Sequence, residues 1–158
     1  MPTINASKKD LEQLIGKKFS EEELTEALMY VKGELDKIDG DALTIEVKET
    51  NRPDLWSTEG IAREIRSRIG MERGIKKYSV AKAKTSCTIE ASVEKSRPFI
   101  ACAIVRDVKV TENLLLQTIQ LQEKVGMTYG RKRKETGIGL YDYDMMKMPL
   151  FYRGYGDN

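Results

Sequence analysis

ALTIEVKETNRPDLWSTEGIAREIRSRIG, residues 42–70, passes from a strand pattern to a helix pattern across a single proline. Apolar and polar residues alternate over 43–47, which indicates a half-buried strand. Pro53 fixes its own φ and keeps the residue before it out of the helical region, so we expect a turn here. Apolar residues at helical spacing then predict a helix that Gly70 closes. A strand and a helix this close together favour an α+β fold.

The residues before this stretch predict a small helix-plus-hairpin domain. Ser7 and Ser20 each stand three residues before an acidic residue, a pattern that caps the start of a helix. We expect the two helices to end at Gly16 and Gly33, because glycine accepts the left-handed conformation of a helix end. A turn signal at 39–41 then joins two strand patterns into a β-hairpin.

The residues after this stretch predict a second region with its own strands and helix. Phe99–Val105 is an apolar run rich in strand formers, which we expect to be a buried strand, after another predicted strand at 87–93. Thr111 begins a predicted helix whose apolar stripe, residues 114–125, should face a core. The predicted organisation is a first domain at 1–71, a linker at 72–85 and an incomplete mixed α/β region at 86–158.

Composition excludes several kinds of chemistry. The chain has no histidine, which rules out a Ser-His-Asp triad, a Cys-His pair and histidine metal sites within it. Cys87 and Cys102 lack the spacing of a zinc or redox motif, so we expect reduced, partly buried thiols. The sequence shows no membrane-spanning run and no secretory signal, which predicts a cytoplasmic location. The net charge is only +2, so any contact with nucleic acid requires a local patch.

Such a patch is present near the C-terminal end. Arg131, Lys132, Arg133 and Lys134 are four adjacent cations, and Tyr129 lies two residues before them. The cations are suited to an RNA backbone and the tyrosine to stacking on a base. A solvated loop, or a partner for nearby acids, explains the same charges equally well.

The turn itself is a second candidate. Asn51, Arg52, Pro53 and Asp54 have a functional interpretation as a contact with tRNA or with another subunit. We favour a structural turn that orients the next helix, because turn chemistry explains every residue except Arg52. We expect Asp54 to cap that helix.

Two further patterns predict structure rather than chemistry. Asp142 and Asp144 have no third ligand nearby, so turn formation and N-capping are favoured over a metal site. Gly137 and Gly139 lack the third glycine and the following helix of a dinucleotide fingerprint. These patterns predict no metal ligand, and no catalytic residue is assigned within this chain.

Three segments in order carry a family resemblance. They are the start at 1–14, the run ETNRPDLWSTEGIAREI at 49–65, and residues 97–124 continued by 131–144. The second resembles the N-R-x-D-L-x-x-x-E-G-I-A-R-E signature of phenylalanyl-tRNA synthetase beta subunits. The third is similar to the opening of the editing (B3/B4-like) domain of the archaeal and eukaryotic members. The resemblance covers nearly the whole chain and implies their N-terminal portion.

The resemblance implies a larger assembly. An alpha subunit carries the site that joins phenylalanine to tRNA with ATP and magnesium, and the beta subunit hydrolyses wrongly made tyrosyl-tRNA. Beta chains of the family are several times longer, so we expect a fragment or truncated relative that binds no cofactor itself. This segment alone, without the class II motifs, is expected to be inactive. Two alternatives are a free-standing RNA-binding module and a purely structural domain that binds the alpha subunit.

Overall fold

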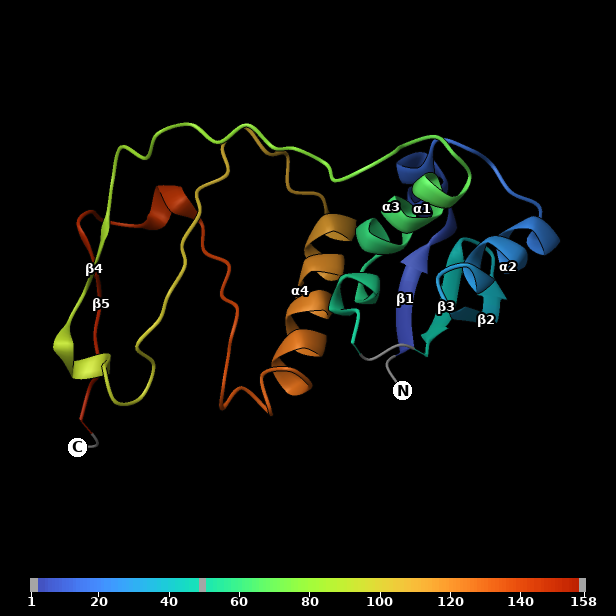
Figure 1. Cartoon of the computed structure of the whole chain (residues 1–158). Helices are drawn as coiled ribbons and strands as arrows, with labels where there is room; N and C mark the ends of the chain where they lie inside the picture. The colour runs from blue at the N-terminus through green and yellow to red at the C-terminus, as the bar shows by residue number, and fades with distance from the viewer. Residues whose placement is uncertain (1–2, 49–50, 157–158) are drawn as a thin grey trace. The chain divides into compact units, whose positions relative to one another are not determined.

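The computed structural model describes residues 3–48 and 51–156, and it combines helices with two small β-sheets (Figure 1). This confirms the predicted α+β class. The chain divides into two compact units, and the continuous hydrophobic core lies in the first. The first unit comprises residues 1–76 and 110–137, and the second comprises residues 77–109 and 138–158.

A three-stranded antiparallel sheet forms one layer of the first unit. Its strands are β1 (Thr3–Ser7), β2 (Gly33–Asp39) and β3 (Ala42–Val47), with β3 in the middle. The turn between β2 and β3 places Gly40 at a φ of 59°, and the two strands form the expected hairpin. Every second residue of β3 is buried, so one face of the sheet carries the core.

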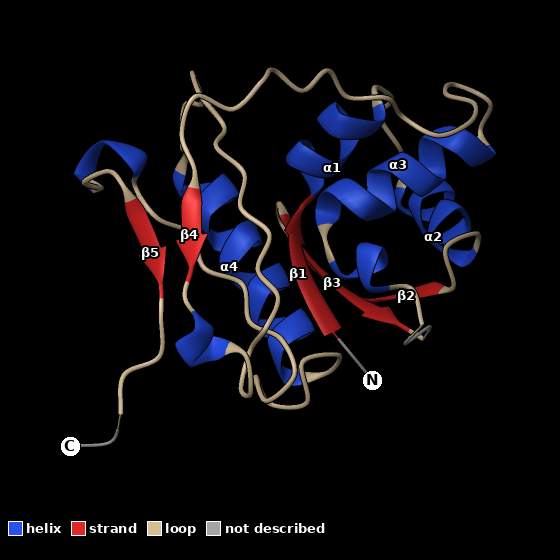
Figure 2. Ribbon diagram, turned by 60° about the vertical axis from the view of Figure 1, so that its left-hand side comes forward, coloured by secondary structure: helices blue, strands red, loops and turns tan. Residues whose placement is uncertain are grey.

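Three helices complete the core of the first unit: α1 (Lys8–Ile15), α2 (Glu21–Met29) and α3 (Thr58–Arg68) (Figure 2). α1 packs against α3, and α2 packs against β2. Their buried apolar side chains belong to one core cluster with Trp56, which is only 1% exposed. The predicted helices of the N-terminal half are thus confirmed, and they share one core with the hairpin.

The ends of these helices follow their sequence signals in part. Ser7 caps α1, and Ser20 and Glu23 form the full reciprocal capping box at α2. The expected end of α2 at Gly33 was wrong. The helix stops at Met29, the chain reverses through Lys32 at a φ of 53°, and Gly33 opens β2 instead. Pairing of Gly33 with β3 removes it from the helix.

The helix α4 (Glu112–Met127) lies along β1, the strand at one edge of the sheet. The Asn5 N–H donates to Gln120 Oε1 at 2.8 Å, and the Asn5 carbonyl accepts from Gln117 Nε2 at 2.9 Å and from Gln120 Nε2 at 3.0 Å. An edge strand leaves backbone groups without a strand partner, and these two side chains pair with them.

The apolar stripe predicted to face the core on this helix is therefore only partly correct. Leu121 and Val125 pack against the core, but Gln117 is buried beside them. Leu115, Leu116 and Ile119 are exposed. The reason is that α4 covers the polar edge of the sheet as well as apolar side chains.

The second unit has little buried apolar surface. β4 (Cys87–Ile89) pairs in parallel with β5 (Leu150–Tyr152), and the 3-10 turn η2 (Ala91–Val93) follows β4. Among the described residues of this unit, Val93 is the buried apolar side chain. Residues 99–105 form no strand, so that prediction was wrong, because none of the described segments pairs with them.

The strand predicted at 87–93 is only partly correct. The observed strand β4 ends at Ile89, and residues 91–93 form η2. Cys87 and Cys102 are free thiols, but only Cys87 is partly buried and Cys102 is exposed. Burial, with the neighbouring Cys102 thiol, raises the pKa of Cys87 above its usual value. Residues 71–86, which contain the whole predicted linker, have no helix or strand.

Candidate nucleic-acid interface

The basic run Arg131–Lys134 folds back onto the C-terminal end of α4. The Gly130 N–H donates to the Val125 carbonyl at 2.8 Å, and the Arg133 N–H donates to the Gly126 carbonyl at 2.8 Å. The last carbonyls of a helix lack partners within it, so this turn satisfies them. It also holds positive charge near the negative end of the helix dipole.

The backbone of this turn is left-handed over three consecutive residues. The φ angles are 47° at Arg131, 59° at Lys132 and 63° at Arg133, in a region that side-chain-bearing residues seldom adopt. A Cβ at Gly130 would lie 2.5 Å from the Gly126 carbonyl oxygen, so glycine is required there. The basic run therefore forms an ordered turn with a defined backbone conformation.

The four cations differ in their surroundings. Arg133 forms an ion pair with Glu123 of α4, and Arg131 forms one with Glu135 at 3.6 Å. Among the residues that the structure describes, Lys132 and Lys134 have no carboxylate partner. The arginines thus fit the explanation that the run pairs with nearby acids. The two lysines have no such pairing among the described residues.

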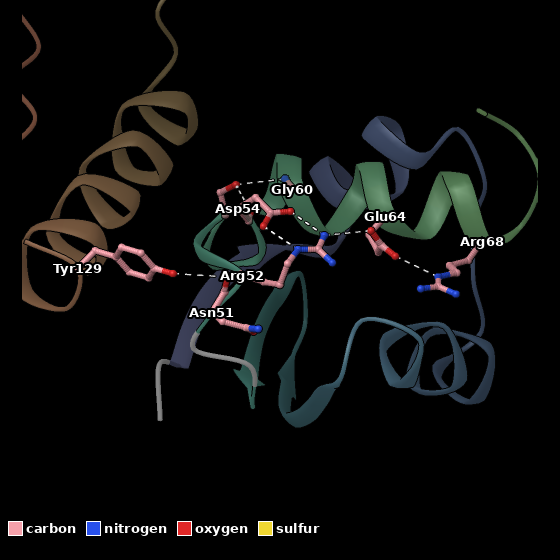
Figure 3. Close-up of polar contacts among 8 residues, drawn as sticks. Asn51, Arg52, Asp54, Gly60, Glu64, Arg68 and Tyr129 are labelled. Atoms are coloured by element: carbon pink, nitrogen blue, oxygen red, sulfur yellow. Dashed lines mark hydrogen bonds and ion pairs between the residues drawn. The ribbon is translucent and has the colours of Figure 1, made fainter. Parts of the chain in front are cut away.

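Tyr129 brings the basic turn next to the Asn51–Asp54 turn (Figure 3). Its ring meets Trp56 edge-on, with 5.9 Å between the centroids and 64° between the planes. Its hydroxyl donates a long hydrogen bond of 3.5 Å to the Asn51 carbonyl oxygen. Trp56 is buried while Tyr129 remains 52% exposed. Two candidates that are more than seventy residues apart in sequence therefore lie together, a proximity for which the sequence carries no local signal.

Arg52 is held by two carboxylates (Figure 3). Its guanidinium donates to both carboxylate oxygens of Asp54, at 2.9 and 2.8 Å, and to Glu64 at 3.1 Å. Arg68 donates to the second oxygen of Glu64 at 3.0 Å. This network accounts for the residue that turn chemistry alone left unexplained, because Arg52 fastens the turn to the helix that follows.

The network shifts the ionisation of its members. The hydrogen bonds from Arg52 lower the pKa of Asp54 below its usual range. Partial burial acts to raise the pKa of Glu64, but the hydrogen bonds from Arg52 and Arg68 outweigh it and lower that pKa. The same hydrogen bonds from Asp54 and Glu64 raise the pKa of Arg52. Asp54, Glu64 and Arg52 therefore all retain their charges at neutral pH.

The helix after the turn begins differently from the prediction. Asp54 lies in the 3-10 turn η1 (Pro53–Trp56), and Ser57 caps α3 by accepting from the Gly60 N–H at 3.1 Å. The prediction of Asp54 as the cap was wrong, because its carboxylate is bound by Arg52. A Cβ at Gly60 would lie 1.7 Å from the Asp54 carbonyl oxygen, which explains the glycine.

The remaining candidates are structural. Asp142 Oδ1 accepts from the Asp144 N–H at 3.0 Å and caps the short turn η3 (Tyr143–Met145), as the turn prediction expected. Within residues 3–48 and 51–156, no three histidine, cysteine or acidic residues gather as a metal site would require. No helix in the described part of the chain has the length and apolar character needed to cross a membrane.

Comparison with known proteins extends this description. No model of a known protein family matches the chain. The phenylalanine–tRNA ligase beta subunit of Pyrococcus furiosus is 43% identical over 157 residues, covering 97% of this chain and 28% of the relative. That of Thermococcus gammatolerans is 44% identical over the same length and covers the same shares. A crystal structure of an N-terminal fragment of the phenylalanyl-tRNA synthetase beta subunit from Pyrococcus horikoshii superposes with a TM-score of 0.90 at 42% identity, over 96% of this chain and 45% of that one.

The chain belongs to the phenylalanyl-tRNA synthetase beta-subunit family. The match to an N-terminal fragment confirms the recognition from the three sequence segments. The chain spans about 28% of the length of the curated relatives. Within the synthetase beta-subunit fold, the Arg52 network occupies the N-R-x-D-L signature, and the signature glycine is Gly60.

Proposed function

We propose that this chain works as the N-terminal part of the beta subunit of phenylalanine–tRNA ligase, which attaches phenylalanine to tRNA using ATP. The observation that carries the proposal is the agreement of sequence and fold over nearly the whole chain, 43% identity over 97% of it and a TM-score of 0.90. The proposed roles of the segment are scaffolding and tRNA handling in the cytoplasm. A free-standing RNA-binding module is not favoured, since the relatives reported above are synthetase beta subunits.

The proposed partners are the alpha subunit, which would carry the aminoacylation site, and tRNA. ATP and magnesium belong to that site. The described residues hold no cluster of carboxylates that fits a magnesium ion, so no step of the reaction is assigned to them.

The proposed domains are 1–71 for the first domain, 72–85 for a linker and 86–158 for the beginning of the editing domain that hydrolyses tyrosyl-tRNA. The compact units support a boundary near the linker, because the first stretch of the first unit ends at residue 76, within the proposed linker. They also refine the proposal, since residues 110–137 return to the first unit and bring the basic turn with them.

A chimera tests the proposed function. This sequence would replace the matching 157 residues of the Pyrococcus furiosus beta subunit, which would then be combined with the Pyrococcus alpha subunit and tRNA. We expect the chimera to bind the alpha subunit and to form phenylalanyl-tRNA within about tenfold of the parent rate, a loss of about 1.4 kcal/mol at most. A Pyrococcus beta subunit that lacks the segment is the control. A folded chimera no more active than this deletion would contradict the proposal.

A further inference from the structure

We propose that Tyr129, Lys132 and Lys134 form a contact site for single-stranded RNA, in which Tyr129 stacks on a base and the two lysines bind neighbouring phosphates. Arg131 and Arg133 are paired with carboxylates of the chain itself and do not contact the RNA. The inference deepens the proposed function and rests on it, because the synthetase assembly supplies the RNA.

The ion pairs separate the two kinds of cation. Glu123 and Glu135 neutralise Arg133 and Arg131, and a guanidinium that already has a carboxylate partner gains less from a phosphate. Lys132 and Lys134 have no such partner among the described residues, and lysine ammonium groups bind phosphate as mobile point charges. The charge available to RNA is therefore that of the two lysines.

Only the side chains of this turn are available to bind an anion, because its backbone N–H groups are already hydrogen-bonded. The N–H groups of Lys132 and Arg133 donate to the carbonyls of Met127 and Gly126, at 3.2 and 2.8 Å, so they do not bind an anion. The left-handed path at Lys132 is fixed by these bonds before any RNA arrives. A preformed turn reduces the entropy lost on binding, which favours recognition by its lysines.

Tyr129 supplies a supported platform. Trp56 holds its ring from one side, and about half of the residue remains exposed to solvent. Trp56 itself is too deeply buried to receive a base. A duplex keeps its bases stacked on one another, whereas an unpaired base is free to stack on an aromatic ring. This arrangement favours single-stranded over double-stranded RNA.

The chain contains one tryptophan, so it carries its own reporter. A fluorescently labelled single-stranded RNA of about a dozen nucleotides, roughly one single-strand binding site, is titrated with the 158-residue chain and followed by anisotropy. Emission from Trp56 is recorded in parallel, because stacking on Tyr129 alters the surroundings of its neighbour. We expect binding with a change in Trp56 emission, and weaker binding of the same sequence as a duplex.

Three sets of variants assign the contacts. Lys132→Ser with Lys134→Ser should reduce the slope of log affinity against log salt by about 1.4, since each single-strand phosphate contact contributes about 0.7. Arg131→Gln with Arg133→Gln is the matched control and should leave the slope unchanged. Tyr129→Leu keeps an apolar cover over Trp56 and should weaken binding at least about tenfold, while Tyr129→Phe should bind as the parent does. Circular dichroism checks that each variant is folded.

Several outcomes would overturn the site. One is an unchanged salt slope in the lysine variant, or an equal reduction of the slope in the arginine variant. Another is an unchanged RNA affinity in Tyr129→Leu. A third is binding of polyglutamate as tightly as RNA, which would show that the patch binds any polyanion. The chimera distinguishes this failure from failure of the proposed function. If the chimera charges tRNA but Tyr129 does not bind RNA, only the contact site is contradicted. If RNA binds but the chimera is inactive, only the proposed function is contradicted.

Discussion

Arg52 shows how one side chain can turn a local signal into a fixed geometry. Its guanidinium binds Asp54 two residues away and Glu64 twelve residues away. The first partner follows from the sequence of the turn. The second depends on the direction in which α3 leaves that turn, which only the fold sets. Turn chemistry alone therefore does not predict how the arginine of this turn is used.

Arg52→Met tests the network through its pH dependence. Asp54 and Glu64 have lowered pKa values in the folded protein, so their contribution is present above the unfolded value of about 4 and is lost as pH falls through the folded values. We expect the variant to lose about 1 kcal/mol of unfolding free energy at pH 7, because the pairs are partly exposed. The difference from the parent should shrink towards pH 3.

Urea unfolding at pH 7 and pH 3 measures the effect. Lys37→Met removes an exposed pair with Asp39 and serves as the control, with no measurable change expected at either pH. A loss of equal size at both pH values would show that Arg52 acts by packing its side chain rather than through charge.

At the scale of elements, the start of α4 was predictable from the sequence, but the residues on its buried face were not. The helix begins after Thr111 as its cap predicted. Its buried face, however, includes Gln117, whose side chain accepts from the Thr58 hydroxyl at 2.8 Å and donates to the Asn5 carbonyl. Apolar periodicity assigns a glutamine to solvent, and it carries no information about the edge of a sheet more than a hundred residues earlier.

Gln117→Leu tests this role of α4. The substitution keeps a buried side chain of similar size but leaves the Thr58 hydroxyl without its acceptor. We expect a loss of about 1 to 3 kcal/mol of unfolding free energy, measured by urea denaturation. Gln122→Leu on the same helix removes no hydrogen bond seen among the described residues and should change stability little. A variant at Gln117 as stable as the parent would mean that the amide contributes no net stabilisation.

Elements with local capping and turn signals were predictable, and elements that depend on distant partners were not. The hairpin and the helices of the first unit follow from periodicity, caps and Gly40. The run 99–105 has strand composition but no strand neighbour among the described residues. The candidate site divides in the same way, since the basic run is visible in sequence while the Tyr129–Trp56 contact is not.

At the scale of the whole molecule, the two units differ in what holds them together. The first unit has a continuous core that joins its sheet to its helices. In the second unit, β4 and β5 pair with each other. Among the described residues of this unit, Val93 alone is a buried apolar side chain, at 3% exposure. Burial of apolar surface supplies most of the free energy of folding, so the second unit should open far more easily.

Hydrogen exchange with mass spectrometry measures this difference on the chain as it stands. We expect peptides from β3 and α3 to require opening free energies of ~5 kcal/mol or more, against ~2 kcal/mol or less for peptides covering 87–93 and 150–152. Exchange rates are corrected for sequence, so each unit is compared with its own unfolded reference. Equal protection of β4 and β3 would show that the second unit gains stability from apolar contacts that its described burial does not contain. The contact site at Tyr129 lies in the first unit, so its RNA binding should persist under conditions in which the second unit is open.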